Sequence, residues 1–327
     1  MQVTCIQNKV EGTPNHLTNL NVFYQNISAF LNININTQMK QFFLMAALAI
    51  SFTGFSQKVS NKLSFQKGQK LEMVSKVNSI VSMEMMGQTM DTKIDATITR
   101  LFDVEDVANG AATIEHKMKR MQMSFESPMA GGAQSFDSDK EADMKGEAGK
   151  AMEKALKNKY AMTLDPSGKI TAIKADDDNP NKSEKKVDVA AGDMMSGAMA
   201  GMADGMGLPS AGDFSEFKVL PEAGATKGGT WTDTAEGKKA VYTVTDVTDA
   251  DVIINYTEEG TTSKTQEANG MELKISSKDK TTGKIILDKK SGLLKERTAT
   301  TDSEGTMEIM GQSVPMTTKV TKVTTVK

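Results

Sequence analysis

Cysteine is almost absent from this 327-residue sequence, with Cys5 as its single example. One thiol can form neither an internal disulfide nor a multi-thiolate metal site. Histidine is nearly as scarce, with His16 and His116, so histidine-dependent triads and histidine-rich zinc sites are hard to assemble. These absences exclude most familiar catalytic machinery and predict a protein held together by packing.

Aromatic residues make up 5% of the chain and Trp231 is the single tryptophan, whereas methionine and glycine number 24 and 26. A core built from such flexible and small side chains is less tightly specified than an aromatic one. The formal net charge is -3, with lysines and acids mixed along the sequence, so no basic face would attract a phosphate backbone. Composition therefore argues against nucleic acid as a partner.

A short apolar run at 42–52 follows a lysine and precedes small residues at 54–56. The run is too short to span a bilayer comfortably. A positive residue, a short apolar run and a small-residue cleavage site are the three parts of a secretory signal peptide. We therefore expect a signal peptide at 39–56, with translation starting at Met39 and cleavage before Gln57.

Residues 1–56, an upstream extension plus the signal peptide, are then expected to be absent from the mature protein. Cys5 and His16 both lie in that part, so the mature chain would have no thiol and one histidine. No cysteine follows the apolar run, which argues against a lipid-modified residue there. These features predict an exported, periplasmic or extracellular protein that is not a transmembrane protein.

The stretch 82–104 alternates apolar and polar residues on both sides of Gly87-Gln88. Period-two alternation is typical of half-buried strands, so the stretch predicts an antiparallel hairpin. Nearly the same pattern, with Met-Gly-Gln between its arms, returns at 307–320, which indicates one sheet design used twice. A turn at Asn109-Gly110 and alternation over 112–125 predict a third strand in the first sheet.

The segment 138–160 has the features of an amphipathic helix. Ser138 and Glu141 match a capping box, and an apolar stripe follows them. Gly146 and Gly149 weaken the helix by about 1 kcal/mol each relative to alanine. We expect this helix to lie across a face of the first sheet.

The patterns together predict a mainly β (α+β) protein with two related antiparallel, curved sheets, one of which has a covering amphipathic helix. The N-terminal half would be 57–178 and the C-terminal half 213–327, where everything from Trp231 onward reads as strand. Residues 179–212, which include a Met/Gly/Ala-rich run, would form a linker or covering segment. The C-terminal half has no helix of its own, so its apolar face needs cover from elsewhere in the chain, from a ligand or from a partner.

The residues that lead into the predicted C-terminal sheet form a pattern that resembles one found in other proteins. Leu220 and Pro221 are followed by Gly229 and Trp231, then by turns at 283 and 291–292 and the terminal Met-Gly-Gln hairpin. In this pattern the chain resembles a family of uncharacterised exported bacterial proteins, often lipoproteins. The family has no assigned activity, so the resemblance implies no site residue and no cofactor. Its members often carry a lipid-modified cysteine after the signal, which this sequence lacks.

Four kinds of function remain open. Long antiparallel strands that are covered on one side could enclose an apolar or lipid-like ligand, which predicts a non-enzymatic binding or carrier module. A structural or adhesive role in the cell envelope is the alternative. Methionines grouped at 83–90, 118–123 and 194–206 could offer thioethers to Cu(I), although their spacing on the strands suits core positions. A carboxylate-based hydrolase would need two acids, but no acid lies in a recognisable motif.

No catalytic, cofactor-binding or metal-ligating residue is assigned from the sequence, and no cofactor is expected. His116 shares a face with Ile114 and Met118. That placement is typical of a packed structural histidine rather than a ligand.

Overall fold

The computed structural model describes residues 58–85, 87–128, 132–175, 207–235, 237–268, 271–309 and 311–327. The predicted signal peptide at 39–56 and most of the predicted linker at 179–212 lie outside these residues. The chain divides into two units, Met1–Ser56 and Gln57–Lys327. The second unit contains all the described elements. None of its described helices is both long and apolar enough to cross a membrane.

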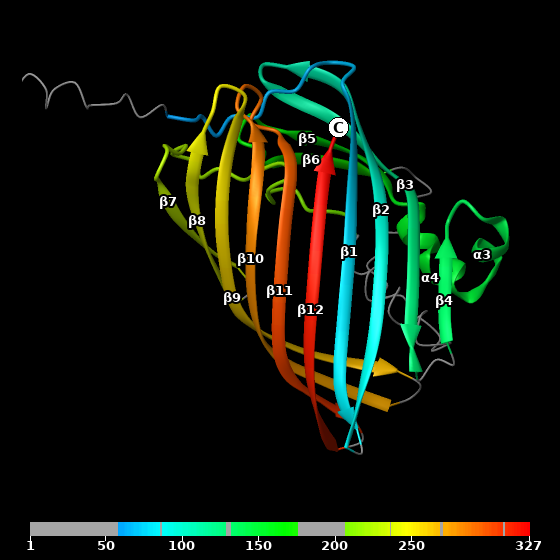
Figure 1. The fold of residues 1–327 in the computed structure, drawn as a ribbon. Coiled ribbons are helices and arrows are strands. Elements are labelled where there is room, and N and C mark those ends of the chain that lie inside the picture. Colours follow the sequence, from blue (N-terminus) through cyan, green and yellow to red (C-terminus); the bar gives the residue numbers. More distant parts are fainter. Residues whose placement is uncertain are drawn as a thin grey trace, which may run out of the picture. The chain divides into compact units, whose positions relative to one another are not determined.

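Twelve strands form one sheet in the order β6-β5-β3-β2-β1-β12-β11-β10-β9-β8-β7, with β4 also paired to β3 (Figure 1). All of the pairings are antiparallel. The elements are β1 (Lys70–Met85), β2 (Gln88–Ala108), β3 (Ala111–Ser127), β4 (Gly132–Asp137), α3 (Glu141–Lys145), α4 (Glu147–Leu156), β5 (Lys159–Leu164), β6 (Ile170–Ala175), β7 (Thr230–Ala235), β8 (Lys238–Val247), β9 (Asp251–Ala268), β10 (Met271–Asp288), β11 (Leu294–Ile309) and β12 (Gln312–Val326).

The predicted mainly β character is confirmed, but the prediction of two sheets is wrong because β1 and β12 pair directly. Their register runs from Met73 opposite Val326 to Met83 opposite Met316. The two Met-Gly-Gln hairpins are β1–β2 and β11–β12, and they lie side by side in the sheet (Figure 1). An unpaired strand edge exposes a row of backbone N–H and C=O groups. Pairing β1 with β12 satisfies both edges and joins the two halves.

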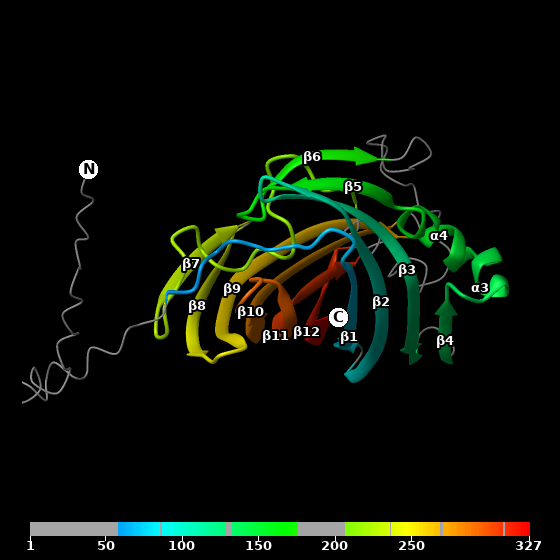
Figure 2. The same cartoon turned by 90° about the horizontal axis from the view of Figure 1, so that it is seen from above.

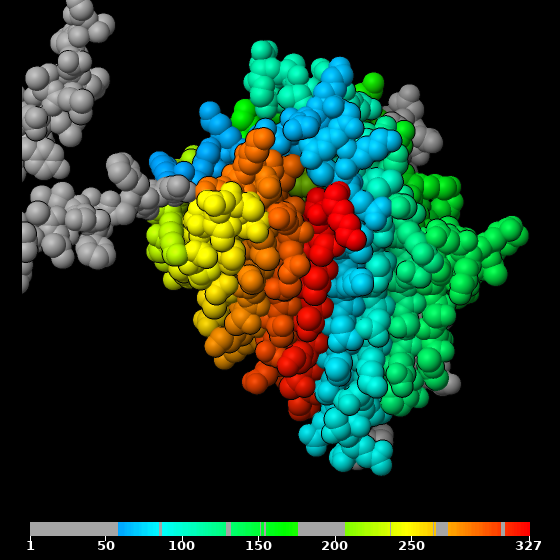
Figure 3. Space-filling model, turned by 45° about the horizontal axis from the view of Figure 1, so that its top comes forward, coloured from blue at the N-terminus to red at the C-terminus, as the bar shows by residue number. Residues whose placement is uncertain are grey.

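The sheet is strongly curved, so that β5 and β6 lie across from β11 and β12 (Figure 2). Side chains alternate between its two faces: Met73 and Ser75 are buried on one face, whereas Lys76 and Asn78 are exposed on the other. We call the side that Met73 and Ser75 share the inner face and the opposite side the outer face. The outer face of β10, β11, β12 and β1 forms one continuous surface (Figure 3).

Two connecting segments, 58–69 and 207–229, cover the upper inner face, which is the end of the sheet away from the Met-Gly-Gln turns. Backbone pairing holds them in place, since Val59 bridges to Ala225 and Phe214 to Lys169. Their buried apolar side chains complete two core clusters with the sheet; these side chains are Val59, Leu63, Phe65, Phe217, Leu220 and Ala225. The apolar face of the C-terminal half is thus covered by Val59 from the N-terminal side and by Leu220 and Ala225 from the start of the half itself.

The helix predicted at 138–160 is wrong in its extent and in its start. In its place, residues 138–160 contain two short helices, α3 and α4, separated at Gly146, where the backbone is extended. The proposed capping box does not form, because Ser138 accepts a hydrogen bond from the Met121 amide instead. In α4, Met152 and Ala155 are buried against residues of β2, β3 and β4. The helix therefore packs at one side of the sheet and does not lie across it.

Candidate binding surface

One row of side chains crosses the inner face from β7 to β2, and we call it the central row. Cross-strand register makes each member a neighbour of the next: Trp231, Tyr242, Tyr256, Gly283, Ala299, Lys322, Val77 and Ala96. The upper inner face lies on one side of this row. On the other side, toward the Met-Gly-Gln turns, is what we call the lower inner face.

The first part of the central row is a stack of aromatic rings. The centroids of Trp231 and Tyr242 are 5.0 Å apart at an interplanar angle of 8°, and Tyr242 stacks on Tyr256 at 5.4 Å. A Cβ at Gly283 would overlap the Tyr256 ring, so glycine is what allows that ring to lie over β10. Burial raises the pKa of both tyrosines. This part of the row is therefore flat, apolar and uncharged near neutral pH.

Positive charge lies beside the aromatic part. Lys322 belongs to the row itself, and Arg297 on β11 is opposite Thr324, two residues further along β12. Arg100 on β2 completes the group. Lys322 keeps contact with solvent, but the surrounding sheet partly desolvates its ammonium group, which is the main reason why its pKa is lowered. The charges of Arg100 and Arg297 lower the pKa further, and Glu216 opposes them with a smaller effect. Arg100 and Arg297 therefore both act electrostatically on Lys322.

These cations differ in how they are neutralised. Arg100 forms an ion pair with Glu216 of the 207–229 segment, with an N–O distance of 2.6 Å. Within the described ranges, Arg297 and Lys322 have neither an ion pair nor a side-chain hydrogen bond. The Nε atom of Arg297 is buried without a hydrogen-bond partner, which is an uncommon state for a charged group.

The lower inner face is half-buried and rich in apolar and small side chains. On β12, the inward residues Val314, Met316, Thr318 and Val320 are half-buried, whereas the outward residues between them are exposed. On β1, Val77, Ser79, Val81 and Met83 are half-buried in the same register. Here the sheet curvature shelters apolar side chains that the described chain does not bury.

The structure separates the methionine groups that the sequence suggested as ligands. Met121 and Met123 are buried and Met118 packs beside them, so this group belongs to the core. Met83 is opposite both Met90 and Met316, which places three thioethers side by side on the lower inner face. Met316 was not among the candidates, because it lies far from the others in the sequence. Met86 and the methionines at 194–206 lie outside the described residues, as does the side chain of Met85.

His116 is a packed core residue, as its face in the sequence predicted. It is 3% exposed, and its ring lies 4.5 Å from Tyr160 and 5.1 Å from Phe102. Burial, with a smaller effect of the Arg100 charge, lowers its pKa to about 4. The imidazole is therefore neutral at physiological pH.

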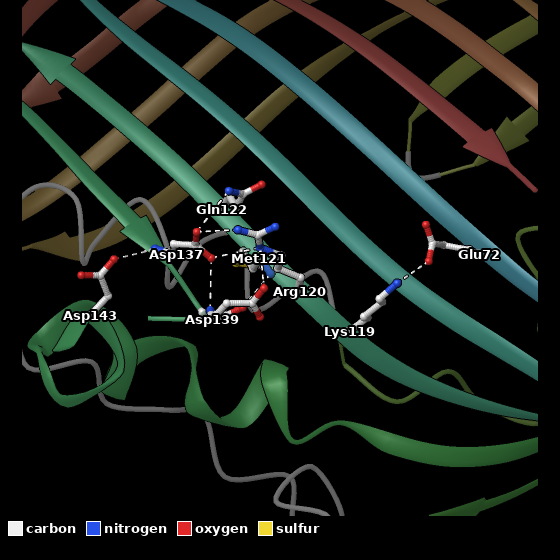
Figure 4. Close-up of polar contacts among 9 residues, drawn as sticks. Glu72, Lys119, Arg120, Met121, Gln122, Asp137, Asp139 and Asp143 are labelled. Atoms are coloured by element: carbon white, nitrogen blue, oxygen red, sulfur yellow. Dashed lines mark hydrogen bonds and ion pairs between the residues drawn. The ribbon is translucent and has the colours of Figure 1, made fainter. Parts of the chain in front are cut away.

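An acidic network lies where β4 leads into α3 (Figure 4). Asp137 accepts two hydrogen bonds from Arg120, at 3.1 and 2.6 Å, and Arg120 also pairs with Asp139 at 2.9 Å. Asp143 accepts a hydrogen bond from the Asp137 amide. The hydrogen bonds from Arg120 hold the pKa of the Asp137 carboxyl well below its usual range. The network fastens this turn to β3.

The described part of the chain has no group of three or more His, Cys, Asp or Glu side chains placed to hold a metal ion.

A depression of about 420 Å³ lies over Gly283. Most of its lining residues, such as Asn255, Lys284 and Thr321, alternate toward the outer face. It is therefore a feature of the polar outer surface and does not belong to the lower inner face.

Comparisons with known proteins identify a family and no activity. A model described as "Family of unknown function (DUF6263)" matches residues 109–294, more than half of the chain. No curated protein matches.

Among solved structures, the chain is similar to lipovitellin in a structure titled for its lipid–protein interactions. The identity is 10% and the TM-score 0.43, and the match covers 81% of this chain and 25% of that one. It is also similar to an outer membrane channel from Pseudomonas putida F1, with 7% identity, a TM-score of 0.24 and coverage of 81% and 98%. The chain thus spans about a quarter of the lipovitellin chain, and neither likeness is close enough to transfer a function.

Proposed function

This chain belongs to the DUF6263 family, whose function is unknown, and we propose that it is a non-enzymatic binding or carrier module for an apolar or lipid-like ligand. The ligand would lie on the lower inner face. The family match confirms the uncharacterised family that the sequence resembled. Family membership assigns no activity, so the proposal rests on the surface itself.

The observation that carries the proposal is the contrast between the two parts of the inner face. The upper part is filled by the chain's own segments, with Phe217 and Leu220 fully or almost fully buried. The lower part leaves Val81, Val320 and Met316 half-buried in the same sheet. Apolar area removed from water stabilises a complex by about 25 cal/mol per Å². A ligand lying along these strands would therefore gain most of its binding free energy from this surface.

The state of the ionisable groups supports a role without catalysis. His116 is neutral and enclosed by aromatic rings, which leaves it no access to a substrate. Asp137, the carboxylate with the strongly lowered pKa, is neutralised by Arg120. A general acid or base needs a pKa near the working pH and access to the reacting atoms, and neither group has both.

We also propose that the protein is exported. The support is the ordered series of a positive residue, an apolar run and small residues at 39–56. A location outside the cytoplasm suits a carrier of apolar molecules between membranes or from the surroundings. The same location suits the alternative role, a structural or adhesive protein of the cell envelope.

Mass spectrometry of the protein purified from its native host tests both statements. Under native conditions, we expect an added mass on the protein that is lost under denaturing conditions and extracts into organic solvent. The denatured mass should correspond to a chain that begins at Gln57. A chain that retains 1–38 would contradict export, and a homogeneous protein without added mass would favour the structural or adhesive role.

A further inference from the structure

Two cations on the inner face are left without a counter-charge by the part of the chain that the structure describes. Arg297 and Lys322 lie on the inner face of the adjacent strands β11 and β12, two residues apart along the paired register, because Arg297 is opposite Thr324. Glu216, the acid that approaches this group, is already paired with Arg100. The buried Nε–H of Arg297 has no acceptor. Like charges this close repel each other, and leaving a buried donor unpaired costs free energy.

The other charged groups of the inner face do not neutralise this pair. Glu258 lies two strands away from β11. It is opposite Thr281, which is opposite Thr301, so it is level with a residue four positions nearer the Met-Gly-Gln turn than Arg297. Asp279 accepts hydrogen bonds from the hydroxyls of its neighbours and has Lys238 within 3.7 Å. The field at Arg297 and Lys322 is therefore positive.

An apolar track begins at these cations and runs to the lower end of the sheet. From Lys322 the inward side chains of β12 are Val320, Thr318 and Met316, and those of β1 beside them start at Val77. Six residues of an antiparallel strand span about 20 Å. One leaflet of a bilayer, which a long acyl chain crosses, has a hydrocarbon depth of about 15 Å, half of the usual core thickness. The track is long enough for such a chain.

We propose that the ligand is a long-chain amphiphile with an anionic head group, with the head at Arg297 and Lys322 and the chain along the inward side chains of β12 and β1. This inference rests on the proposed function and specifies its ligand. A carboxylate or a phosphate head would supply the counter-charge that Arg297 and Lys322 lack, and would relieve the repulsion between the two cations. Guanidinium and ammonium groups bind both kinds of head through charge-assisted hydrogen bonds.

Isothermal titration of the purified protein with four amphiphiles of equal chain length tests the inference. The ligands are palmitate, hexadecyl phosphate, monopalmitoylglycerol and hexadecyltrimethylammonium, each below its micelle concentration. We expect the two anions to bind at least about tenfold more tightly than the neutral glyceride, and the cation to bind most weakly. The preference of the anions should fall as salt is raised, since salt screens the attraction. The tighter of the two anions identifies the head as carboxylate or phosphate.

The matched variants are the double substitution Arg297→Gln and Lys322→Gln, and a control with Lys284→Gln and Lys319→Gln on the outer faces of β10 and β12. The inner pair should bring the anions down to the affinity of the neutral glyceride and leave the glyceride itself unchanged. The outer pair removes the same charge and should leave all four affinities unchanged. Thermal unfolding without ligand reports folding; the inner pair should be no less stable than the wild type, because repulsion is removed.

The outcomes separate this inference from the function on which it rests. Equal affinity for anionic and neutral ligands, or a preference that survives in the inner-face variant, overturns the anionic head group and leaves the binding module standing. Failure of all four ligands to bind overturns both.

Discussion

Replacing Phe217 by alanine should lower the free energy of unfolding by about 3–5 kcal/mol, the range for removing a buried aromatic side chain. Phe217 is 0% exposed, and its ring contacts Phe65 and Phe102 edge-on, with centroids 5.6 and 5.1 Å away. It reaches the sheet from the 207–229 segment, so the substitution leaves a cavity where that segment meets both the N-terminal segment and β2. Urea unfolding should show a lower midpoint with an unchanged m-value.

Phe214 supplies the control for this substitution. It belongs to the same segment but is 50% exposed, so Phe214→Ala should change stability by no more than about 0.5 kcal/mol. If the two alanine variants unfold at the same urea concentration, the 207–229 segment is not part of the core, and the upper inner face is open as well.

Acid should destabilise the protein between about pH 6.5 and pH 4 because of His116. Its pKa is lowered to about 4 in the folded protein, whereas the unfolded chain protonates it near 6.5. The unfolded state therefore binds more protons over this interval, so stability is full above pH 6.5 and falls as pH decreases toward 4. The expected loss is about 3 kcal/mol, at 1.36 kcal/mol for each pH unit between the two values. Denaturant titrations at several pH values measure it.

His116→Phe is the variant that isolates this effect. Phenylalanine keeps an aromatic ring between Tyr160 and Phe102 but cannot bind a proton. Whatever its stability at pH 7, the free energy of unfolding of the variant should no longer depend on pH between 6.5 and 4. Asp137 does not produce the same pH dependence. Its pKa is lowered in the folded protein, so its contribution to stability is lost at a pH more acidic than this interval. A variant with the same slope as the wild type would show that another group is responsible.

Local features of the fold could be predicted from the sequence, whereas the way they join could not. The alternation of apolar and polar residues predicted both Met-Gly-Gln hairpins. The predicted turn at Asn109-Gly110 also forms, with both residues at positive φ. The single sheet depends on β1 pairing with β12, and the buried hydroxyls of Ser75 and Thr324 that hydrogen-bond across it lie 249 positions apart. No local pattern specifies which strand edges meet at such a separation.

The ends of the longest strands have no signal in the sequence for a related reason. Strand β9 continues to Ala268, although inward positions such as Gly260 and Thr262 are small and polar. An alternation of apolar and polar residues appears only where one face is buried in apolar surroundings. Where the sheet projects beyond the core, hydrogen bonding to neighbouring strands keeps the chain extended without that signal.

The candidate site was missed, although part of its signal was present. Alternation in the sequence of β8 and β9 puts Tyr242 on the same face as Val244, and Tyr256 on the same face as Ile254. Extending the same alternation along β11 and β12 would have placed Arg297 and Lys322 inward too, and a charged residue at an inward position is a reason to suspect a site. That Lys322 belongs to the row that begins at Trp231, and that Arg297 lies beside this row, becomes visible once the register of the strands is known.

Binding of an apolar fluorescent probe to two single variants of β1 tests the central claim, that the lower inner face is the ligand site. Val81 and Ile80 are consecutive, apolar and half-buried, but Val81 points inward and Ile80 outward in the register with β2 and β12. A carboxylate on the inner face would have to be desolvated by the ligand, so Val81→Asp should weaken probe binding by about tenfold or more, whereas Ile80→Asp should leave it unchanged. Equal binding by both variants, with both folded by circular dichroism, would contradict the account.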